Sequence, residues 1–342
     1  MRITQADIAK IANVSQPTVS RVVSGDGRVE EGIRQRVLEV MREHNYQPDA
    51  RARSLRSKRA GLIGLVVKRP KGGLSDDPFF ASLISAIMDF LVGKPYHLCA
   101  DMTLDAQSQV GLYDELLRSR RVDGLILVES EALDERVHRL QADHFPFVLI
   151  GNPMGNEAIW SVDNDNVLAG RIATQHLLDQ GFRRIGFLAG PSETTVTRDR
   201  LEGYMQALRG RQDRAFVWHS DFGSQAAREA TREHILTAPE VPDALVVLDD
   251  FMAMGAVQAL RDFGANVPGD MGLVSFNDSA ICRLIEGGLS SVSLNIETLV
   301  QTACERLVDA IEGRDPDGPR RTLIPSALIA RGSSQPREVA RR

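Results

Sequence analysis

Residues 6–25 read ADIAKIANVSQPTVSRVVSG and decide how the chain begins. On the first half of this stretch, apolar residues recur at helical spacing, namely Ile8, Ile11 and Ala12. Thr4, followed three residues later by Asp7, is a pattern typical of a capped helix start. We therefore predict a short amphipathic helix that begins after Thr4 and ends near Asn13.

A second short helix follows within the same stretch. Ser15 can cap it, and Pro17 lies in its first turn, where the missing N–H removes no hydrogen bond. Its buried stripe consists of Val19, Val22 and Val23. The short turn between the two helices is the spacing of a helix-turn-helix, whose second helix enters the major groove of DNA.

The outward face of this second helix carries side chains able to contact DNA. Gln16 offers an amide that can pair with adenine, and Arg21 offers a guanidinium that can pair with guanine. With the two caps, the head residues assigned to DNA contact are Thr4, Ser15, Gln16, Pro17, Thr18, Ser20 and Arg21. Two short helices are equally compatible with an ordinary surface hairpin whose Gln and Arg are solvated.

The charge of the chain is unevenly distributed. The net charge is −5 over 342 residues, yet residues 1–60 hold twelve Lys or Arg and only seven Asp or Glu. The head therefore carries +5 and the remainder −10. Because an acidic body is repelled by phosphate, this asymmetry indicates a polyanionic partner for the head alone.

Length and composition exclude several classes of protein. A chain of 342 residues with 43% apolar content should form more than one domain. Its cysteines, Cys99, Cys282 and Cys304, are too few and too widely spaced for a disulfide scaffold and suit a reducing compartment. No apolar run is long enough to span a bilayer, so we expect a cytoplasmic protein.

Catalytic motifs are missing as well. The sequence has no Gly-rich phosphate loop, no dinucleotide-binding glycine pattern, no paired histidines and no Gly-x-Ser-x-Gly. We therefore predict no cofactor, no metal and no enzymatic activity.

Beyond residue 60 the sequence consists of short apolar runs that alternate with helical patterns. The first set of runs is 61–67, 96–101, 123–128 and 147–151, and the second is 184–190, 215–220, 243–248 and 272–276. Such alternation is typical of parallel strands buried on both faces. The predicted fold class is thus α/β, with an all-α helix-turn-helix head and two doubly wound parallel-sheet lobes. Ligands bind such sheets at the carboxyl ends of their strands.

Residues 6–25 resemble the start of the lactose/galactose-repressor (LacI/GalR) family of bacterial transcription factors. The resemblance continues through a third helix, about 31–44, to the segments 46–48 and 52–55. In that family the last segment is a hinge helix that folds on the operator and places a leucine in the minor groove. The resemblance assigns DNA contacts here to Ala52, Arg53, Leu55 and Arg56; a flexible basic linker is the alternative.

Two positions depart from the family pattern. Residues 29–33 lack the usual Ser or Thr cap and Pro before the third helix, so that helix start is less well specified. Asp49 stands where Asn is common, which keeps a cap but removes an amide donor.

The domain boundaries expected from these patterns are a head at 1–46, a hinge at 47–59 and a body at 60–342. We assign 60–161 plus 293–320 to the first lobe and 162–292 plus 321–332 to the second. The segments 291–295 and 321–326 are predicted to be strands that cross between the lobes.

The body resembles periplasmic sugar-binding proteins, and this resemblance implies an effector site between its lobes. Arg200 occupies the position of the family's ligand-binding arginine, and Phe222 that of the aromatic that covers the ligand. Asn277 stands where Asp is common, and Asp249 where Asn is common. Further candidates are Phe79, Phe80, Asn152 and Asp163. Helix capping by Asp163, Asp250 or Asp278, and a core position for Phe80, remain alternatives.

The segments 145–153 and 160–166 look like the maltose-regulator branch, which implies an α-glucoside such as maltose as effector. A purine, or a phosphorylated protein as in catabolite control, is an alternative effector. A solute-binding receptor and a nucleotide-dependent enzyme are more distant alternatives. The resemblance implies a homodimeric repressor on a palindromic operator, which a sugar releases. The last residues carry no leucine heptads, so we expect a dimer and no C-terminal coiled coil.

The head assignments predict two different mutant phenotypes. Arg21→Ala should relax sequence preference and cost ~1–3 kcal/mol of operator binding, because it removes a base contact. Arg53→Ala should weaken binding to all sequences and lower the salt dependence, because it removes a phosphate contact. Salt titrations on operator and random duplexes distinguish the two. A uniform loss for both variants would mean that Arg21 contacts only phosphate.

Overall fold

The computed structural model describes residues 3–23, 27–46, 59–68, 77–131, 134–210 and 215–335. The chain divides into two compact units, Met1–Ala60 and Gly61–Arg342. The proposed hinge contacts Ala52, Arg53, Leu55 and Arg56 lie outside the described residues. None of the described helices is both long and apolar enough to cross a bilayer.

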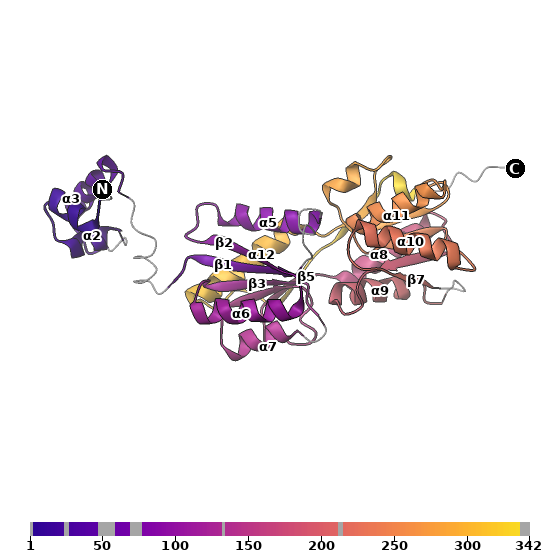
Figure 1. Ribbon diagram of the computed structural model, residues 1–342, viewed down its shortest axis with the longest axis horizontal. Helices are drawn as coiled ribbons and strands as arrows, with labels where there is room; N and C mark the ends of the chain where they lie inside the picture. Colours follow the sequence, from indigo (N-terminus) through magenta and orange to yellow (C-terminus); the bar gives the residue numbers. More distant parts are fainter. Residues whose placement is uncertain are drawn as a thin grey trace. The chain divides into compact units, whose positions relative to one another are not determined.

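The head consists of three helices, α1 (Gln5–Ile11), α2 (Gln16–Val23) and α3 (Glu31–Glu43) (Figure 1). Thr4 and Asp7 form a reciprocal cap at the start of α1: the Asp7 N–H donates to Thr4 Oγ1 (3.3 Å) and the Thr4 N–H donates to Asp7 Oδ2 (3.0 Å). Ser15 Oγ accepts the Thr18 N–H at 3.3 Å and caps α2 as predicted. Glu30 at the start of α3 makes no side-chain cap, which agrees with the missing Ser or Thr.

A small apolar core holds the three helices together. From the predicted stripes, Ile8, Ala12, Val19 and Val22 are buried in it and Val23 is partly buried, together with Val37 of α3. The prediction for Ile11 was wrong, because this last residue of α1 is 47% exposed. Because the apolar faces of α1 and α2 are consumed by this core, their polar faces remain outward.

The first lobe is a six-stranded parallel sheet in the order β11-β5-β4-β3-β1-β2. Its strands are β1 (Leu62–Lys68), β2 (His97–Thr103), β3 (Gly124–Val128), β4 (Phe147–Ile150), β5 (Ser161–Asn164) and β11 (Arg321–Ile324). Helices α5 (Pro78–Leu91) and α12 (Ile296–Glu312) cover one face, and α6 (Ala106–Ser119) and α7 (Glu135–Ala142) cover the other (Figure 1).

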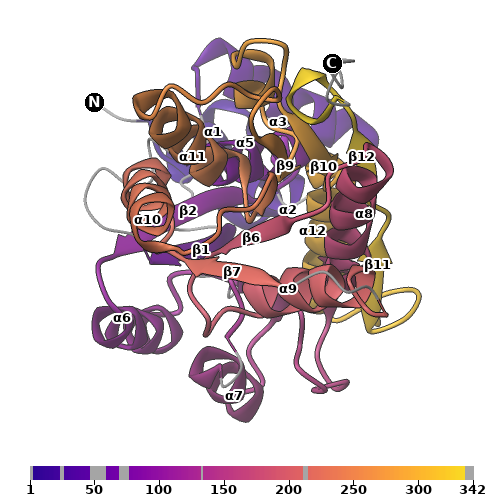
Figure 2. The ribbon, with the colours of Figure 1, turned by 90° about the vertical axis from the view of Figure 1, so that its right-hand side faces the viewer.

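The second lobe repeats this plan with the order β12-β10-β9-β8-β6-β7. Its strands are β6 (Ile185–Ala189), β7 (Phe216–His219), β8 (Ala244–Val247), β9 (Gly272–Asn277), β10 (Ser290–Ser293) and β12 (Ala327–Ile329), of which only β12 runs antiparallel to its neighbour. Helices α8 (Asn166–Asp179) and α9 (Thr195–Ala207) lie on one side of the sheet, and α10 (Ser224–Thr237) and α11 (Asp250–Asp262) on the other (Figure 2). Two single turns, η1 (Ala280–Arg283) and η2 (Gly332–Ser334), complete the described chain.

The lobe assignment needs one correction. We placed 162–292 and 321–332 in the second lobe, but β5 and β11 pair with each other in the first sheet, with Arg321 opposite Ser161. β5 is short, and its polar Asp163 and Asn164 are the reason that the sequence did not identify it as a strand. Short strands such as these acquire their sheet from tertiary pairing, which local sequence does not encode.

The chain passes between the lobes three times. It leaves the first lobe after β5 at Asn164, returns after β10 at Leu294, and leaves again after β11 at Ile324. Asn164, Leu294 and Ile324, one on each crossing, lie close together. The Asn164 side chain donates hydrogen bonds to the backbone carbonyls of the other two residues.

Helices α8 and α9 pack through glycines that let their backbones touch. A Cβ on Gly170 would lie 2.1 Å from the carbonyl oxygen of Arg200, and a Cβ on Gly203 would lie 2.0 Å from that of Val167. This close packing fixes the position of the turn of α9 that carries Arg200.

Gly170 lies in this close contact and Gly111 of α6 lies in open space, so Gly→Ala substitutions at the two positions should have opposite effects on stability. Gly170→Ala should lower the free energy of unfolding by ~1–3 kcal/mol, because backbone atoms must move to admit the methyl group. Gly111→Ala, in α6 with nothing within 4 Å of the added Cβ, should raise it by ~0.5–1 kcal/mol. Urea denaturation of both variants measures the difference. Equal effects would contradict the close α8–α9 contact.

Candidate effector site and DNA-binding face

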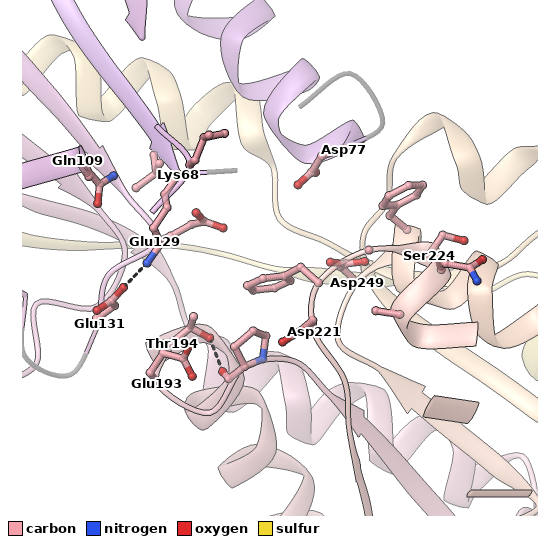
Figure 3. Close-up of a pocket in the computed structure, with 18 of the residues that line it drawn as sticks. Lys68, Asp77, Gln109, Glu129, Glu131, Glu193, Thr194, Asp221, Ser224 and Asp249 are labelled. Atoms are coloured by element: carbon pink, nitrogen blue, oxygen red, sulfur yellow. Dashed lines mark hydrogen bonds and ion pairs between the residues drawn. The ribbon is translucent and has the colours of Figure 1, made fainter. Parts of the chain in front are cut away.

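A cavity with two chambers lies between the lobes, at the carboxyl ends of their strands. The inner chamber, of about 110 Å³, reaches the crossings and is lined by Asn164, Asn166, Leu294 and residues around Arg200. The outer chamber, of about 710 Å³, is bordered by Lys68, Gln109, Glu131, Asp221 and Ser224 among others (Figure 3). Phe222 and Asp249 line both chambers, so the two chambers are adjacent.

Arg200 is the central cation of the inner chamber. Its side chain is 4% exposed, its Nε donates to Asn166 Oδ1 (3.0 Å), and its Nη1 donates to the Leu248 carbonyl (2.6 Å). The guanidinium carbon lies 4.3 Å from the centre of the Phe276 ring. Burial lowers the pKa of Arg200 to about 10, although Asp249 and Asp163 act in the opposite direction. Among the described residues, only Nε and Nη1 of this guanidinium make hydrogen bonds, and Arg200 is one of the residues that line the inner chamber.

Two carboxyl groups face this cation. Asp163 Oδ1 accepts the Asn164 N–H (2.8 Å) and the Asn166 Nδ2 (3.1 Å), while Asp249 Oδ1 accepts the Met252 N–H (2.6 Å) and caps α11. Each uses one oxygen for structure, and both line the cavity. Burial is the main cause that raises the pKa of Asp163 and of Asp249 to about 7, each against the opposing effect of Arg200.

Aromatic and amide groups complete the walls. Phe79 and Phe222 line the inner chamber from the first and second lobes, and Phe251 borders the outer chamber. Asn277 lines the inner chamber at the end of β9 with a φ of 102°, a conformation rare for residues other than glycine. A cation, two carboxyl groups, an amide and apolar rings are the groups that bind sugar hydroxyls and ring faces.

The structure brings together six of the eight candidates for effector contact: Phe79, Asp163, Arg200, Phe222, Asp249 and Asn277. The other two assignments need correction. Phe80 is fully buried in the core of the first lobe, where it packs edge-on against Phe79. Asn152 lines neither chamber, and its Nδ2 donates to Asp199 Oδ2 at 2.7 Å across the lobes.

Helix capping does not explain the three aspartates left open by the sequence. Asp163 caps no helix, Asp278 pairs with Arg331 at 2.6 Å, and Asp250 accepts bonds from the side chains of Ser275 and Ser291. The caps are their neighbours instead, Asp165 on α8 and Asp249 on α11. Asp165 lies two residues after Asp163, and Asp249, which also lines the cavity, lies one residue before Asp250. Sequence does not resolve which aspartate of such a group caps the helix.

Several lining residues escaped the sequence analysis, including Lys68, Gln109, Ser130, Asn164, Asn166 and Thr195. Ser130 and Thr195 come from different lobes and share a hydrogen bond of 2.7 Å between their hydroxyls. The signal that could have found Asn166 is its place in the polar run 163–166, which begins in β5 and continues to the start of α8. Ser and Thr after strand ends carry no comparable signal.

The head presents the side chains expected to meet DNA. Gln16, Pro17 and Arg21 on α2 are exposed, and Thr18 and Ser20 are half-buried beside them. Thr4 and Ser15 serve as caps at the two helix starts. This arrangement is compatible with an α2 that enters a groove by its N-terminal residues.

Comparison with known proteins identifies both units. Residues 4–49 match the family of bacterial regulatory proteins, lacI family, and residues 174–334 match a periplasmic binding protein-like domain. The HTH-type transcriptional regulator CelR of Thermobifida fusca is 32% identical over 97% of this chain and 98% of its own. The ribose operon repressor of Halalkalibacterium halodurans is 31% identical over 97% of each chain, and MalR of Streptococcus pneumoniae is 31% identical over 78% of this chain and 82% of its own. These relatives are regulators and not enzymes.

Solved structures agree with the fold. The transcriptional regulator CelR–cellobiose complex aligns with a TM-score of 0.74 and 30% identity over 97% of this chain and all of that one. A lac repressor dimer bound to operator and the anti-inducer ONPF aligns with a TM-score of 0.84 and 26% identity over 98% of this chain and all of that one. The predicted helix-turn-helix head and two parallel-sheet lobes are confirmed.

The raised pKa of Asp163 predicts how stability depends on pH. Between about pH 4 and 7 the native protein keeps a proton on Asp163 that the unfolded chain has lost, so the free energy of unfolding falls as pH rises through this window. Asp163→Asn removes this titration and should reduce the fall by on the order of 2–4 kcal/mol. Urea denaturation at pH 4, 5.5 and 7 measures it. Parallel pH profiles for both proteins would contradict the assignment.

Proposed function

Because this chain belongs to the lacI family of bacterial regulatory proteins, we propose that this DNA-binding transcriptional regulator is a homodimeric repressor controlled by a sugar. Its heads bind the two halves of a palindromic operator, and an α-linked glucoside such as maltose in the cavity releases them. Two-fold symmetry in the protein suits two recognition helices placed ~34–36 Å apart, one turn of DNA.

The observation that carries the proposal is the group around Arg200. A buried guanidinium lines the cavity together with Asp163 and Asp249, and the three groups offer a donor and two acceptors within one small space. Vicinal hydroxyls of a sugar both donate and accept, and they match such a set better than a purely apolar ligand does. Phe79 and Phe222 supply apolar surface for the ring faces.

The size of the cavity supports a ligand longer than one ring. The inner chamber of about 110 Å³ suits a single ring held by Arg200, and the outer chamber of about 710 Å³ offers space for a second. CelR, solved with cellobiose, and MalR are among the relatives, as is a ribose operon repressor, so it is the size of the cavity that favours a glucoside of two rings over ribose. Between linkages we choose the α form, since residues 145–153 and 160–166 look like the maltose regulators.

Occupancy can control DNA binding only through different affinities of the sugar for two arrangements of the lobes. A coupling free energy of ~1–3 kcal/mol, equivalent to roughly 5–150-fold in operator affinity, is the usual range. The sugar touches both lobes, since Phe79 belongs to the first and Arg200 and Phe222 to the second. Closure around it therefore changes the angle between them.

A ligand screen tests the proposal. Maltose should raise the melting temperature of the purified protein, because a ligand that binds only the native state stabilises it, and it should weaken operator binding. Cellobiose, ribose and hypoxanthine are the comparison ligands. A response to hypoxanthine alone would replace the sugar by a purine, and no preference for a symmetric duplex over random DNA would overturn the repressor.

The role of Arg200 predicts a local loss of affinity. Arg200→Met keeps the apolar stem but removes the donors, and should weaken maltose binding by ~10–100-fold, as expected for a charge-assisted hydrogen bond. Arg198→Ala, on the exposed face of the same helix, is the matched control and should bind normally. Calorimetry measures both variants. Unchanged affinity in Arg200→Met would remove Arg200 from the site.

A further inference from the structure

One buried amide joins all three crossings between the lobes. Asn164, the last residue of β5, is 4% exposed. Its Nδ2 donates to the carbonyl of Leu294 at 2.9 Å and to the carbonyl of Ile324 at 3.1 Å. An amide nitrogen has two hydrogens, so both are used, one for each of the other crossings.

The two acceptors belong to different lobes. Ile324 ends β11 of the first sheet, whereas Leu294 directly follows β10 of the second sheet. Asn164 therefore does more than join two neighbouring strands of one sheet. If one crossing moved alone, its buried carbonyl would lose this hydrogen bond, which opposes separate movement of the three crossings.

The same residue is connected to the ligand cavity. Asp163 Oδ1 accepts the backbone N–H of Asn164 (2.8 Å) and the side-chain amide of Asn166 (3.1 Å). Asn166 Oδ1 in turn accepts Arg200 Nε at 3.0 Å. A continuous chain of hydrogen bonds thus leads from the proposed sugar-binding cation to the crossings, and all of its members are buried.

Residues next to the hydrogen-bonded ones also have features that end a strand or begin a helix. Asn295, which follows Leu294, has a φ of 50° and begins α12 without a side-chain cap of its own. On the other crossings, Asp165 caps α8 and Pro325 follows β11. Each strand ends at, or one residue before, the residue of its crossing that takes part in these hydrogen bonds, and the next element begins two or three residues later.

We propose that Asn164 is a positioning residue that couples the occupied cavity to the lobe movement, and so to operator release, by making the three crossings move as one. This inference rests on the proposed function. It assigns to Asn164 neither sugar recognition nor DNA contact. A sugar that pulls on Arg200 or Asp163 moves Asn166 and the backbone of Asn164, and the side chain of Asn164 transmits this movement to both other crossings.

The test separates coupling from binding. Operator affinity is measured with and without sugar, and sugar affinity without DNA, for the wild type, Asn164→Ala and a control. The sugar is maltose, or cellobiose if only that sugar raises the melting temperature of the wild type. Asn156→Ala is the control, because its Nδ2 donates to Gln141 Oε1 at 2.8 Å within the first lobe alone.

For the wild type and the control we expect the sugar to weaken operator binding by roughly 5–150-fold. For Asn164→Ala, at a sugar concentration that saturates the variant's own cavity, we expect the sugar to weaken operator binding by less than about twofold. Asn164→Leu has a similar volume but no donors, and should behave alike. It carries the test if Asn164→Ala does not fold.

The outcomes are distinct. A wild type that does not respond to either sugar overturns the proposed function and this inference with it. A responsive wild type with an equally responsive Asn164 variant overturns the inference alone. Loss of sugar binding in the folded variant would make Asn164 a ligand contact and would also overturn it.

Discussion

A guanidinium group buried beneath the floor of a cleft must be surrounded by acceptors, and this requirement organises the body of the protein. Arg200 is held by Asn166 from the start of α8 and by the carbonyl of Leu248 at the end of β8. Both partners lie where strands end, so the charge fixes the ends of several elements around one point. The guanidinium and the nearby carboxyl groups then give the cavity its polar character. The site is a consequence of satisfying a charge that the fold has buried.

The two lobes share a plan but are not independent units of the mechanism. Each sheet is completed by a strand from late in the chain, β11 in the first and β12 in the second, and the connections between them run through a single narrow region. Hydrogen bonds that span the lobes flank this region, such as those between Ser130 and Thr195 and between Asn152 and Asp199. Three crossings that run side by side allow the lobes to bend in few directions, which suits two discrete arrangements of the lobes better than a continuous range.

The head was predictable because its signals are local. The cap at Thr4, the cap at Ser15 and the valine stripe of α2 each depend on residues within one helical turn. The missing cap of α3 was also evident from residues 29–33. In the body the buried strands β1, β3, β6 and β8 were evident as apolar runs, whereas the polar β5 and the three-residue β12 were not.

For the site, the sequence supplied residue types and the family resemblance supplied positions such as Arg200 and Phe222. It could not separate Phe80, which packs inward, from Phe79, which reaches the cavity, because adjacent helix positions differ by about 100° in direction and only the packed sheet decides which is inside. The sequence by itself determined the helix-turn-helix head, the α/β alternation and the charge asymmetry, since these depend on local periodicity and composition. Only the tertiary structure decided which strands join which sheet and how Asn164 reaches Leu294 and Ile324, because these contacts join residues more than a hundred positions apart.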